Sequence, residues 1–167
     1  MEIKSKAADA EVTSTFWTTG PGRGNPGGAS ELDMFEMFGG HKTNEAWKKR
    51  LKFNIISWDP TNQINIEQKK KGKIGTTHTR MIQADHNTAD DFHVYGFEWT
   101  EDKAVWSVDG VVKRELLRVD LSSNKAQKWP DEEMYIVLNN EVQTNATDKT
   151  TQWPNYLKID YVEIYQK

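Results

Sequence analysis

The sequence predicts an all-β domain, folded as a sandwich or a barrel. Short runs of strand-forming residues recur along the chain, with turn residues between them. Helical periodicity is almost absent, and residues 44–50 form the one short helix candidate. Asp109-Gly110 lies between two apolar runs, which is typical of a two-residue hairpin turn. Together these observations favour many short antiparallel strands.

The expected strands share β-branched or aromatic residues and are bounded by turn formers. In chain order they are residues 2–6, 11–17, 31–38, 51–58, 63–68, 76–82, 92–99, 104–108, 111–116, 134–140 and 156–165. No repeat or composition change divides them, so we expect residues 1–167 to form a single domain.

Alternation along residues 92–99 predicts which face of that strand is buried. One face carries the residues expected in the core, Phe92, Val94 and Gly96. The other face carries a mixed aromatic and polar row, His93, Tyr95, Phe97 and Trp99. Aromatic rings pack against the C–H groups of sugars while polar side chains bond their hydroxyls, so this row is expected to line a sugar groove.

Composition excludes several classes of protein. The chain has no cysteine, so it has no disulfide, no thiolate metal site and no cysteine nucleophile. A net charge of −3 argues against a general nucleic-acid binder. No apolar run approaches the roughly 20 residues of a membrane helix. Met1 leads directly into charged, strand-like sequence, so no signal peptide is expected at this start, and we expect a monomer without a membrane partner.

The segment Glu31-Leu32-Asp33-Met34-Phe35-Glu36 carries the most chemical information in the chain. Burying several carboxylic acids together is costly unless they do chemistry. Side chains alternate along a strand, so Glu31 and Asp33 share one face. A β-bulge at Met34-Phe35 would return Glu36 to that face, with Leu32 and one of the two bulge residues packed behind it. The alternative interpretation is an edge strand with solvated acids.

A pair of nearby carboxyl groups is what hydrolysis of a glycosidic bond requires. We assign Glu31 as the nucleophile and Glu36 as the general acid and base. Asp33 lies between them and is expected to bond one of them and keep their charges unequal, because close carboxylates do not all ionise at neutral pH. The sequence does not give the separation that distinguishes retention from inversion.

The acid segment resembles the bulged signature E-[LIV]-D-x-x-E of glycoside hydrolase family 16, which includes laminarinases, β-agarases, porphyranases and κ-carrageenases. The resemblance extends over essentially the whole chain. It is also carried by Thr15-Phe16-Trp17, residues 92–99, residues 106–110, Leu138-Asn139 and residues 159–165. Two departures stand out: the chain begins inside the strand at residues 2–6, so the usual N-terminal strands are absent, and Lys4 stands where many relatives carry arginine.

The resemblance implies a jelly-roll β-sandwich of the concanavalin-like type, which the missing N-terminal strands would leave incomplete. It implies an endo-acting, retaining hydrolase of a polysaccharide that requires no cofactor for catalysis and acts in secreted, periplasmic or cell-surface form. The substrate is expected to be a β-1,3-glucan or a red-algal galactan such as agar, porphyran or carrageenan. Residues 69–73 form a lysine cluster. Its simpler interpretation is a charged turn, and the other is contact with an anionic galactan, which clustered positive charges would attract. Relatives also bind a structural Ca²⁺, for which Asp160 is the candidate ligand.

Five residues are candidates for substrate contact, and each has a structural alternative. Trp17 is expected in the groove floor or in the core, and Trp58 in a groove wall or in packing. Trp153 precedes Pro154 in a polar loop and would form a rim contact or cover one end of the sandwich. His93 would bond Asp33, bond the sugar, or be structural. Asn139 would bond a sugar hydroxyl or hold a strand end.

Two other functions remain open from the sequence. A non-catalytic carbohydrate-binding module could use the same sandwich, although a binding face gains nothing from three clustered carboxylates. An incomplete and inactive domain would keep the signature but expose edge strands that promote aggregation.

Overall fold

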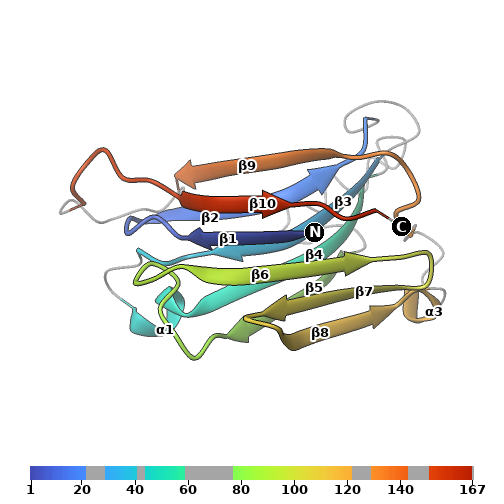
Figure 1. The fold of residues 1–167 in the computed structure, drawn as a ribbon, viewed down its shortest axis with the longest axis horizontal. Helices are drawn as coiled ribbons and strands as arrows, with labels where there is room; N and C mark the ends of the chain where they lie inside the picture. Colours follow the sequence, from blue (N-terminus) through green and yellow to red (C-terminus); the bar gives the residue numbers. More distant parts are fainter. Residues whose placement is uncertain (22–28, 41–43, 59–76, 122–128, 143–150, 167) are drawn as a thin grey trace, which may run out of the picture.

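Two five-stranded antiparallel sheets pack face to face in the computed structural model (Figure 1). The structure describes residues 1–21, 29–40, 44–58, 77–121, 129–142 and 151–166. The predicted strand at residues 63–68 and the lysine cluster at residues 69–73 lie outside these described residues. The predicted all-β sandwich is confirmed.

One sheet carries the three acids and is called the acid-bearing sheet below. Its strand order is β5-β4-β3-β2-β9. The bounds are β2 (Val12–Thr19), β3 (Ala29–Met37), β4 (Arg50–Trp58), β5 (Thr77–Gln83) and β9 (Tyr135–Val142).

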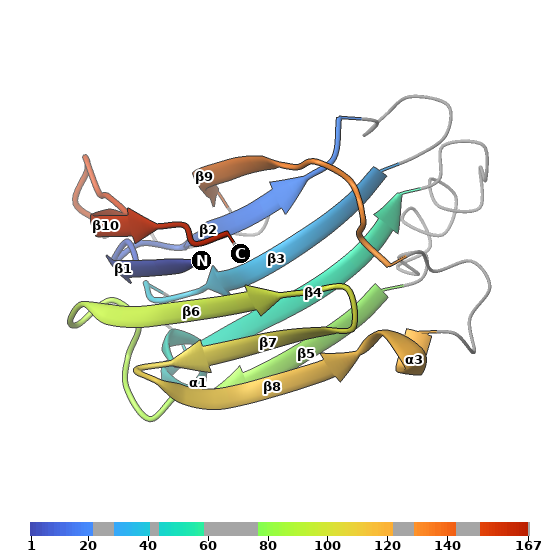
Figure 2. The same ribbon diagram turned by 45° about the vertical axis from the view of Figure 1, so that its right-hand side comes forward.

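The second sheet, called the opposite sheet, has the order β10-β1-β6-β7-β8. Its strands are β1 (Glu2–Lys6), β6 (His93–Trp99), β7 (Lys103–Val108), β8 (Val111–Leu117) and β10 (Lys158–Glu163). In Figures 1 and 2, β6, β7 and β8 lie in front of β3, β4 and β5. Asp109 and Gly110 both have positive φ, 49° and 76°, at the turn between β7 and β8, which confirms the predicted tight hairpin.

Two four-residue helices complete the described structure, α1 (Glu45–Lys48) and α3 (Arg118–Leu121). The first lies inside the predicted helix candidate, and the side chain of Asn44 caps it by accepting a hydrogen bond from the backbone N–H of Ala46. Neither of these described helices has the length and apolar character needed to cross a membrane.

Large aromatic side chains from both sheets fill the space between them. The ring of Phe35 on β3 lies 4.8 Å from that of Tyr95 on β6, and Phe97 lies 5.1 Å from Trp106 on β7. Burying each such side chain contributes roughly 1.5–3 kcal/mol. The buried indole N–H of Trp106 also donates to the backbone oxygen of Asp33, so a core side chain from the opposite sheet fixes the backbone of β3.

The predicted faces of β6 were wrong. Tyr95 and Phe97 are buried in the core, whereas Phe92 is exposed and Gly96 lies on the outer face of the strand. The reason is that β6 belongs to the opposite sheet, so its aromatic row faces the acid-bearing sheet from inside the sandwich. The bulkier aromatic residues take the buried positions because they remove more apolar surface from water.

Replacing a core ring behind the acids should destabilise the domain strongly. We expect Phe35→Ala to lower the free energy of unfolding by about 3–5 kcal/mol, because it leaves a cavity between the sheets. Denaturant unfolding followed by fluorescence measures this change. Val112→Ala on the exposed surface of β8 is the control and should cost less than about 0.5 kcal/mol. A loss below about 1 kcal/mol for Phe35→Ala would contradict this account of the core.

Candidate active site

The bulge predicted in β3 is present. Asp33 pairs with Asn54 of β4, and Glu36 pairs with Lys52, so three steps along β3 match two along β4. The register with β2 shifts at the same place. Met34 and Phe35 are both buried in the core, whereas the sequence predicted only one of them there. The extra residue returns Glu36 to the face of Asp33.

Strand register places the acids in three parallel cross-strand rows. Leu32 is fully buried, so its neighbours Glu31 and Asp33 point away from the core on the outer face of the acid-bearing sheet. Read across β9, β2, β3 and β4, the rows are Tyr135–Thr19–Glu31–Ile56, Val137–Trp17–Asp33–Asn54 and Asn139–Thr15–Glu36–Lys52. This shared face is called the acid face below.

A single amide group joins two of the three acids. The Asn54 Nδ2 group donates one hydrogen bond to Asp33 Oδ2 and another to Glu36 Oε2, the second at 2.9 Å. The Lys52 ammonium lies 2.5 Å from the same Glu36 oxygen. Both carboxyl groups therefore lie within hydrogen-bonding distance of one nitrogen, and a cation offsets part of their negative charge.

The surroundings of Asp33 change the pKa of its carboxyl group. Burial raises the pKa of Asp33 well above its ordinary value, and the charges of Glu31 and Glu36 raise it further. The hydrogen bond from Asn54 and the charge of Lys52 act in the opposite direction but are weaker. The Asp33 carboxyl thus keeps its proton to a higher pH than a solvated aspartate. Unequal charges among the three acids stay a prediction.

Trp17 and Asn139 lie beside the acids, as the sequence predicted. Trp17 pairs with Asp33, and its indole N–H donates to Asn139 Oδ1 at 2.8 Å. The Thr15 hydroxyl donates to the same oxygen at 2.6 Å, so the Asn139 carbonyl group is held by two donors. Because Trp17 shares the acid face and is half-buried, the core alternative for this residue is wrong. Contact of either residue with sugar stays a prediction.

Within the described residues, no contact joins the two remaining tryptophan candidates to the acids. Trp58 is the last residue of β4, and its side chain lies outside the described residues. Trp153 is exposed in the connection between β9 and β10, followed by a cis peptide bond to Pro154. Nearby, Asn155 Nδ2 donates to the backbone oxygen of Asp9, which fixes this connection to the turn before β2. Substrate contact by Trp58 and Trp153 stays a prediction.

The expected hydrogen bond between His93 and Asp33 was wrong. His93 lies on β6 in the opposite sheet, where its Nδ1 is 2.7 Å from Asp109 Oδ2. Its ring stacks on that of His86, with centroids 3.4 Å apart and planes within 8°. The structural alternative for His93 is the correct one, because the core separates this histidine from the acid face.

One group of side chains within the described residues has the composition of a metal site. Ligand atoms of His86, His93 and Asp109 lie within 4.8 Å of one another. The two rings are parallel, however, so their in-plane lone pairs do not converge on one point as tetrahedral coordination needs.

Asp160, the residue predicted to bind calcium, lies on β10 and forms an exposed ion pair with Lys4 of β1. The Lys4 ammonium lies 2.8 Å from Asp160 Oδ2, so a positive charge already accompanies this carboxylate. Calcium binding by Asp160 stays a prediction.

Lys52 and Asn54 are the residues of the site that sequence reasoning missed. In β4 the apolar residues alternate with two polar ones, which are Lys52 and Asn54, so these two share one face of the strand. The apolar residues are Leu51, Phe53 and Ile55. That signal does not give the register that sets them against Glu36 and Asp33, because pairing of β3 with β4 depends on contacts between separate segments.

This geometry defines a β-sandwich with a carboxylic-acid site on one sheet, and comparison with known proteins gives its family. The family model described as glycosyl hydrolases family 16 matches residues 1–163. The chain therefore belongs to glycosyl hydrolases family 16.

Solved structures share the fold at low sequence identity. The laminarinase catalytic domain from Thermotoga maritima has a TM-score of 0.74 at 23% identity, with 95% of this chain and 60% of that chain covered. Porphyranase B from Zobellia galactanivorans has a TM-score of 0.62 at 23% identity, covering 87% of this chain and 52% of that one. This chain thus spans less than two thirds of either structure.

A curated protein also shows sequence similarity. Glucan endo-1,3-beta-glucosidase A1 from Niallia circulans is 31% identical over 87 residues, which is 47% of this chain and 13% of that protein.

The raised pKa of Asp33 predicts a pH-dependent stability difference for Asp33→Asn. Between pH 3.8, the ordinary pKa of aspartate, and the raised pKa of Asp33, the carboxyl group takes up a proton when the chain folds. The free energy of unfolding of the parent therefore falls as pH rises through this range. The neutral amide avoids this cost. We expect the variant to be more stable than the parent near pH 7, with the difference shrinking by about 1.4 kcal/mol per pH unit below the raised pKa.

Urea unfolding of both proteins between about pH 4 and pH 8 measures this difference. Asp160→Asn, which changes an exposed aspartate on the other sheet, is the matched control and should show no comparable trend. A parent that is more stable than Asp33→Asn near neutral pH would show that the carboxyl group is charged and stabilised in the fold.

Proposed function

We propose that this chain hydrolyses internal β-glycosidic bonds of a polysaccharide with net retention of configuration. One observation carries the proposal: the bulge aligns Glu31, Asp33 and Glu36 on one face, where Asn54 bonds two of them. A family of glycosyl hydrolases includes the chain, and these carboxyl groups are the chemistry that such a reaction uses.

The reaction follows a double displacement. In the first step the Glu31 carboxylate attacks the anomeric carbon, and the Glu36 carboxylic acid gives its proton to the departing glycosidic oxygen. The bond between Glu31 and the sugar forms as the glycosidic bond breaks. In the second step Glu36 takes a proton from water, the water oxygen attacks the anomeric carbon, and Glu31 is released. Every step uses carboxyl groups of this chain, so the proposed mechanism needs no cofactor.

Asp33 supports both steps as a positioning residue. Its retained proton lets the Asp33 carboxyl donate a hydrogen bond to a neighbouring carboxylate, which an ionised aspartate cannot do. A neutral Asp33 also adds no charge of its own beside the negative charge that the first step moves from Glu31 to Glu36. Asn54 and Lys52 hold the Glu36 oxygen that they contact.

The sugar chain is proposed to lie across the acid face. Trp17, next to Asp33, offers an aromatic surface held in place by its bond to Asn139. Tyr135 shares the row of Glu31 and is 65% exposed, so its ring is free to pack against a neighbouring sugar. Sugar units bound on both sides of the acids would place an internal bond of the polymer at Glu31.

The similar proteins favour β-1,3-glucan of the laminarin type as the substrate. The curated relative is a glucan endo-1,3-beta-glucosidase, and the structure with a TM-score of 0.74 is a laminarinase. A red-algal galactan is second, because porphyranase B shares the fold at a lower TM-score. Since these polymers are too large to enter a cell intact, we propose that the protein acts in secreted, periplasmic or cell-surface form.

The proposal is tested by measuring reducing-end release from laminarin, mixed-linkage glucan, agarose, porphyran and κ-carrageenan. We expect release from laminarin. Glu31→Gln should lower the turnover rate by on the order of 10⁴-fold or more, because the amide cannot form the covalent intermediate. Its affinity for laminarin, measured by calorimetry, should be nearly unchanged.

Glu115→Gln is the matched control, since it makes the same chemical change on β8, away from the acid face. It should retain full activity. Laminarin binding without release by the folded parent protein would instead identify a carbohydrate-binding module. Activity that survives in Glu31→Gln would overturn the assignment of the nucleophile.

A further inference from the structure

The segment that precedes β9 links the two sheets beside the acids. It consists of residues 129–134 and is called the strap below. The indole N–H of Trp129 donates to the backbone oxygen of Thr100 at 3.1 Å. The indole N–H of Trp99, the last residue of β6, donates to the backbone oxygen of Pro130, also at 3.1 Å. These hydrogen bonds fix the start of the strap to the opposite sheet.

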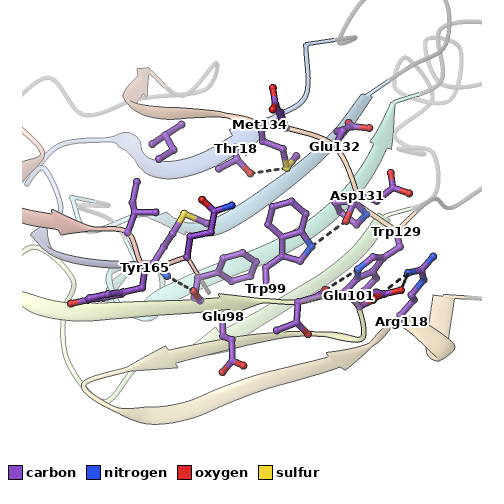
Figure 3. Close-up of a pocket in the computed structure, with 18 residues that line it drawn as sticks. Thr18, Glu98, Trp99, Glu101, Arg118, Trp129, Asp131, Glu132, Met134 and Tyr165 are labelled. Atoms are coloured by element: carbon purple, nitrogen blue, oxygen red, sulfur yellow. Dashed lines mark hydrogen bonds and ion pairs between the residues drawn. The ribbon is translucent and has the colours of Figure 1, made fainter.

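The other end of the strap contacts the acid-bearing sheet. The Thr18 hydroxyl on β2 donates to Met134 Sδ at 3.4 Å, a bond that Figure 3 marks with a dashed line. The backbone N–H of Ser30 on β3 donates to Glu132 Oε1 at 2.6 Å. Ser30 is buried, so its N–H needs a partner within the protein. The strap therefore joins the opposite sheet to both β2 and β3.

The Glu132 carboxylate stands where a backbone acceptor would be expected. Thr19 pairs with Glu31, so Gly20 and Ser30 form the next pair along the two strands. The Gly20 N–H donates to the Ser30 oxygen at 3.0 Å, as in an antiparallel ladder. The Ser30 N–H, which such a pair would direct at the Gly20 oxygen, donates to Glu132 instead. A carboxylate is the stronger acceptor, so this bond fixes the start of β3 firmly.

Glycine at position 20 leaves room for this carboxylate. A Cβ atom at Gly20 would lie 2.2 Å from Glu132 Oε1 and 2.8 Å from its carboxyl carbon, well inside van der Waals contact. Among the described glycines only Gly110 has positive φ, so the backbone at Gly20 would accept alanine. An alanine there would therefore displace the end of the flexible Glu132 side chain and break its bond to Ser30.

The backbone on both sides of Glu31 is tied to other parts of the molecule. Ser30, directly before it, donates to Glu132, and Asp33, two residues after it, accepts from the indole N–H of Trp106. One tie comes from the strap and the other from β7. Glu31 therefore extends from a short piece of strand that is held at two points.

We propose that Glu132 is a positioning residue for Glu31, and that its carboxylate sets where the Glu31 carboxylate lies by fixing the preceding peptide group. This inference rests on the proposed function, in which Glu31 attacks the anomeric carbon. A reacting group has to be held within about 0.5 Å of its productive position. Misplacement by about 1 Å can lower a rate by about 100-fold. Glu132 acts through the backbone at Ser30 and takes no part in the bond changes.

The test compares kcat and KM on laminarin for the parent, Glu132→Ala and Glu132→Gln. We expect Glu132→Ala to lower kcat by about 10-fold to 100-fold, because Glu31 loses its fixed position. KM should change by less than about threefold, since the sugar contacts are elsewhere. Glu132→Gln keeps an oxygen acceptor for Ser30 and should lower kcat by less than about threefold, because an amide oxygen is only a weaker acceptor.

Hydrogen exchange of the Ser30 amide, followed by NMR, reports the contact without relying on activity. It should be faster by about tenfold or more in Glu132→Ala, because the N–H has lost its acceptor. In Glu132→Gln it should stay close to the parent rate. This measurement distinguishes loss of the contact from loss of the whole fold, in which amides throughout β3 would exchange faster.

Gly20→Ala is a second variant that breaks the same contact. In the parent it should lower kcat about as much as Glu132→Ala does. In the Glu132→Ala background it should have almost no further effect, because the added methyl group enters space that the carboxylate has left. Should Glu132→Ala fail to fold, Gly20→Ala tests the contact alone. Glu133→Ala, which removes the exposed neighbouring carboxylate, is the matched control and should keep full kcat.

Two results would overturn the proposal. The first is faster Ser30 exchange in Glu132→Ala with kcat unchanged, which would make the contact purely structural. The second is an equal loss of kcat from Gly20→Ala in both backgrounds, which would show that the two residues act separately. Both differ from failure of the proposed function, in which the parent releases no reducing ends or Glu31→Gln stays active.

Discussion

The site depends on one extra residue in β3. Without the bulge at Met34-Phe35, strict alternation would turn Glu36 into the core, where an unpaired carboxylate is costly. With it, three acids share one face while Leu32, Met34 and Phe35 fill the interior behind them. The same short segment therefore supplies the reactive groups and part of the hydrophobic core, and the indole N–H of Trp106 fixes its backbone at Asp33. A change in core packing is expected to move the acids.

Gathering three carboxyl groups has an electrostatic cost that the neighbouring strand partly offsets. Asn54 and Lys52 on β4 supply a shared hydrogen-bond donor and a positive charge, and the remaining cost raises the pKa of Asp33. An acid that keeps its proton to a higher pH than usual lets the other two take different roles in one small space. Trp17 and Asn139 extend the acid face on β2 and β9.

Within the described residues, local sequence was enough to predict the strands, the bulge and the placement of Glu31, Asp33 and Glu36, because these follow from side-chain alternation and composition within one segment. It failed where the answer depends on which sheet a strand joins. His93, Tyr95 and Phe97 form a plausible groove row by alternation alone, yet β6 belongs to the opposite sheet and turns that row inward. Lys52 and Asn54 were missed because their role depends on the register between two strands, which long-range packing decides.

The central claim is that Asp33, between two neighbouring acids, keeps its proton to a higher pH than a solvated aspartate, and carbon-13 NMR of the side-chain carboxyl groups tests it most directly. The signal that disappears in Asp33→Asn assigns the residue, and its chemical shift is followed with pH. The account predicts a titration midpoint clearly above 3.8, the ordinary value for aspartate. A midpoint at or below 3.8 would show that the fold does not favour the protonated Asp33 carboxyl, and the division of roles among the three acids would then be wrong.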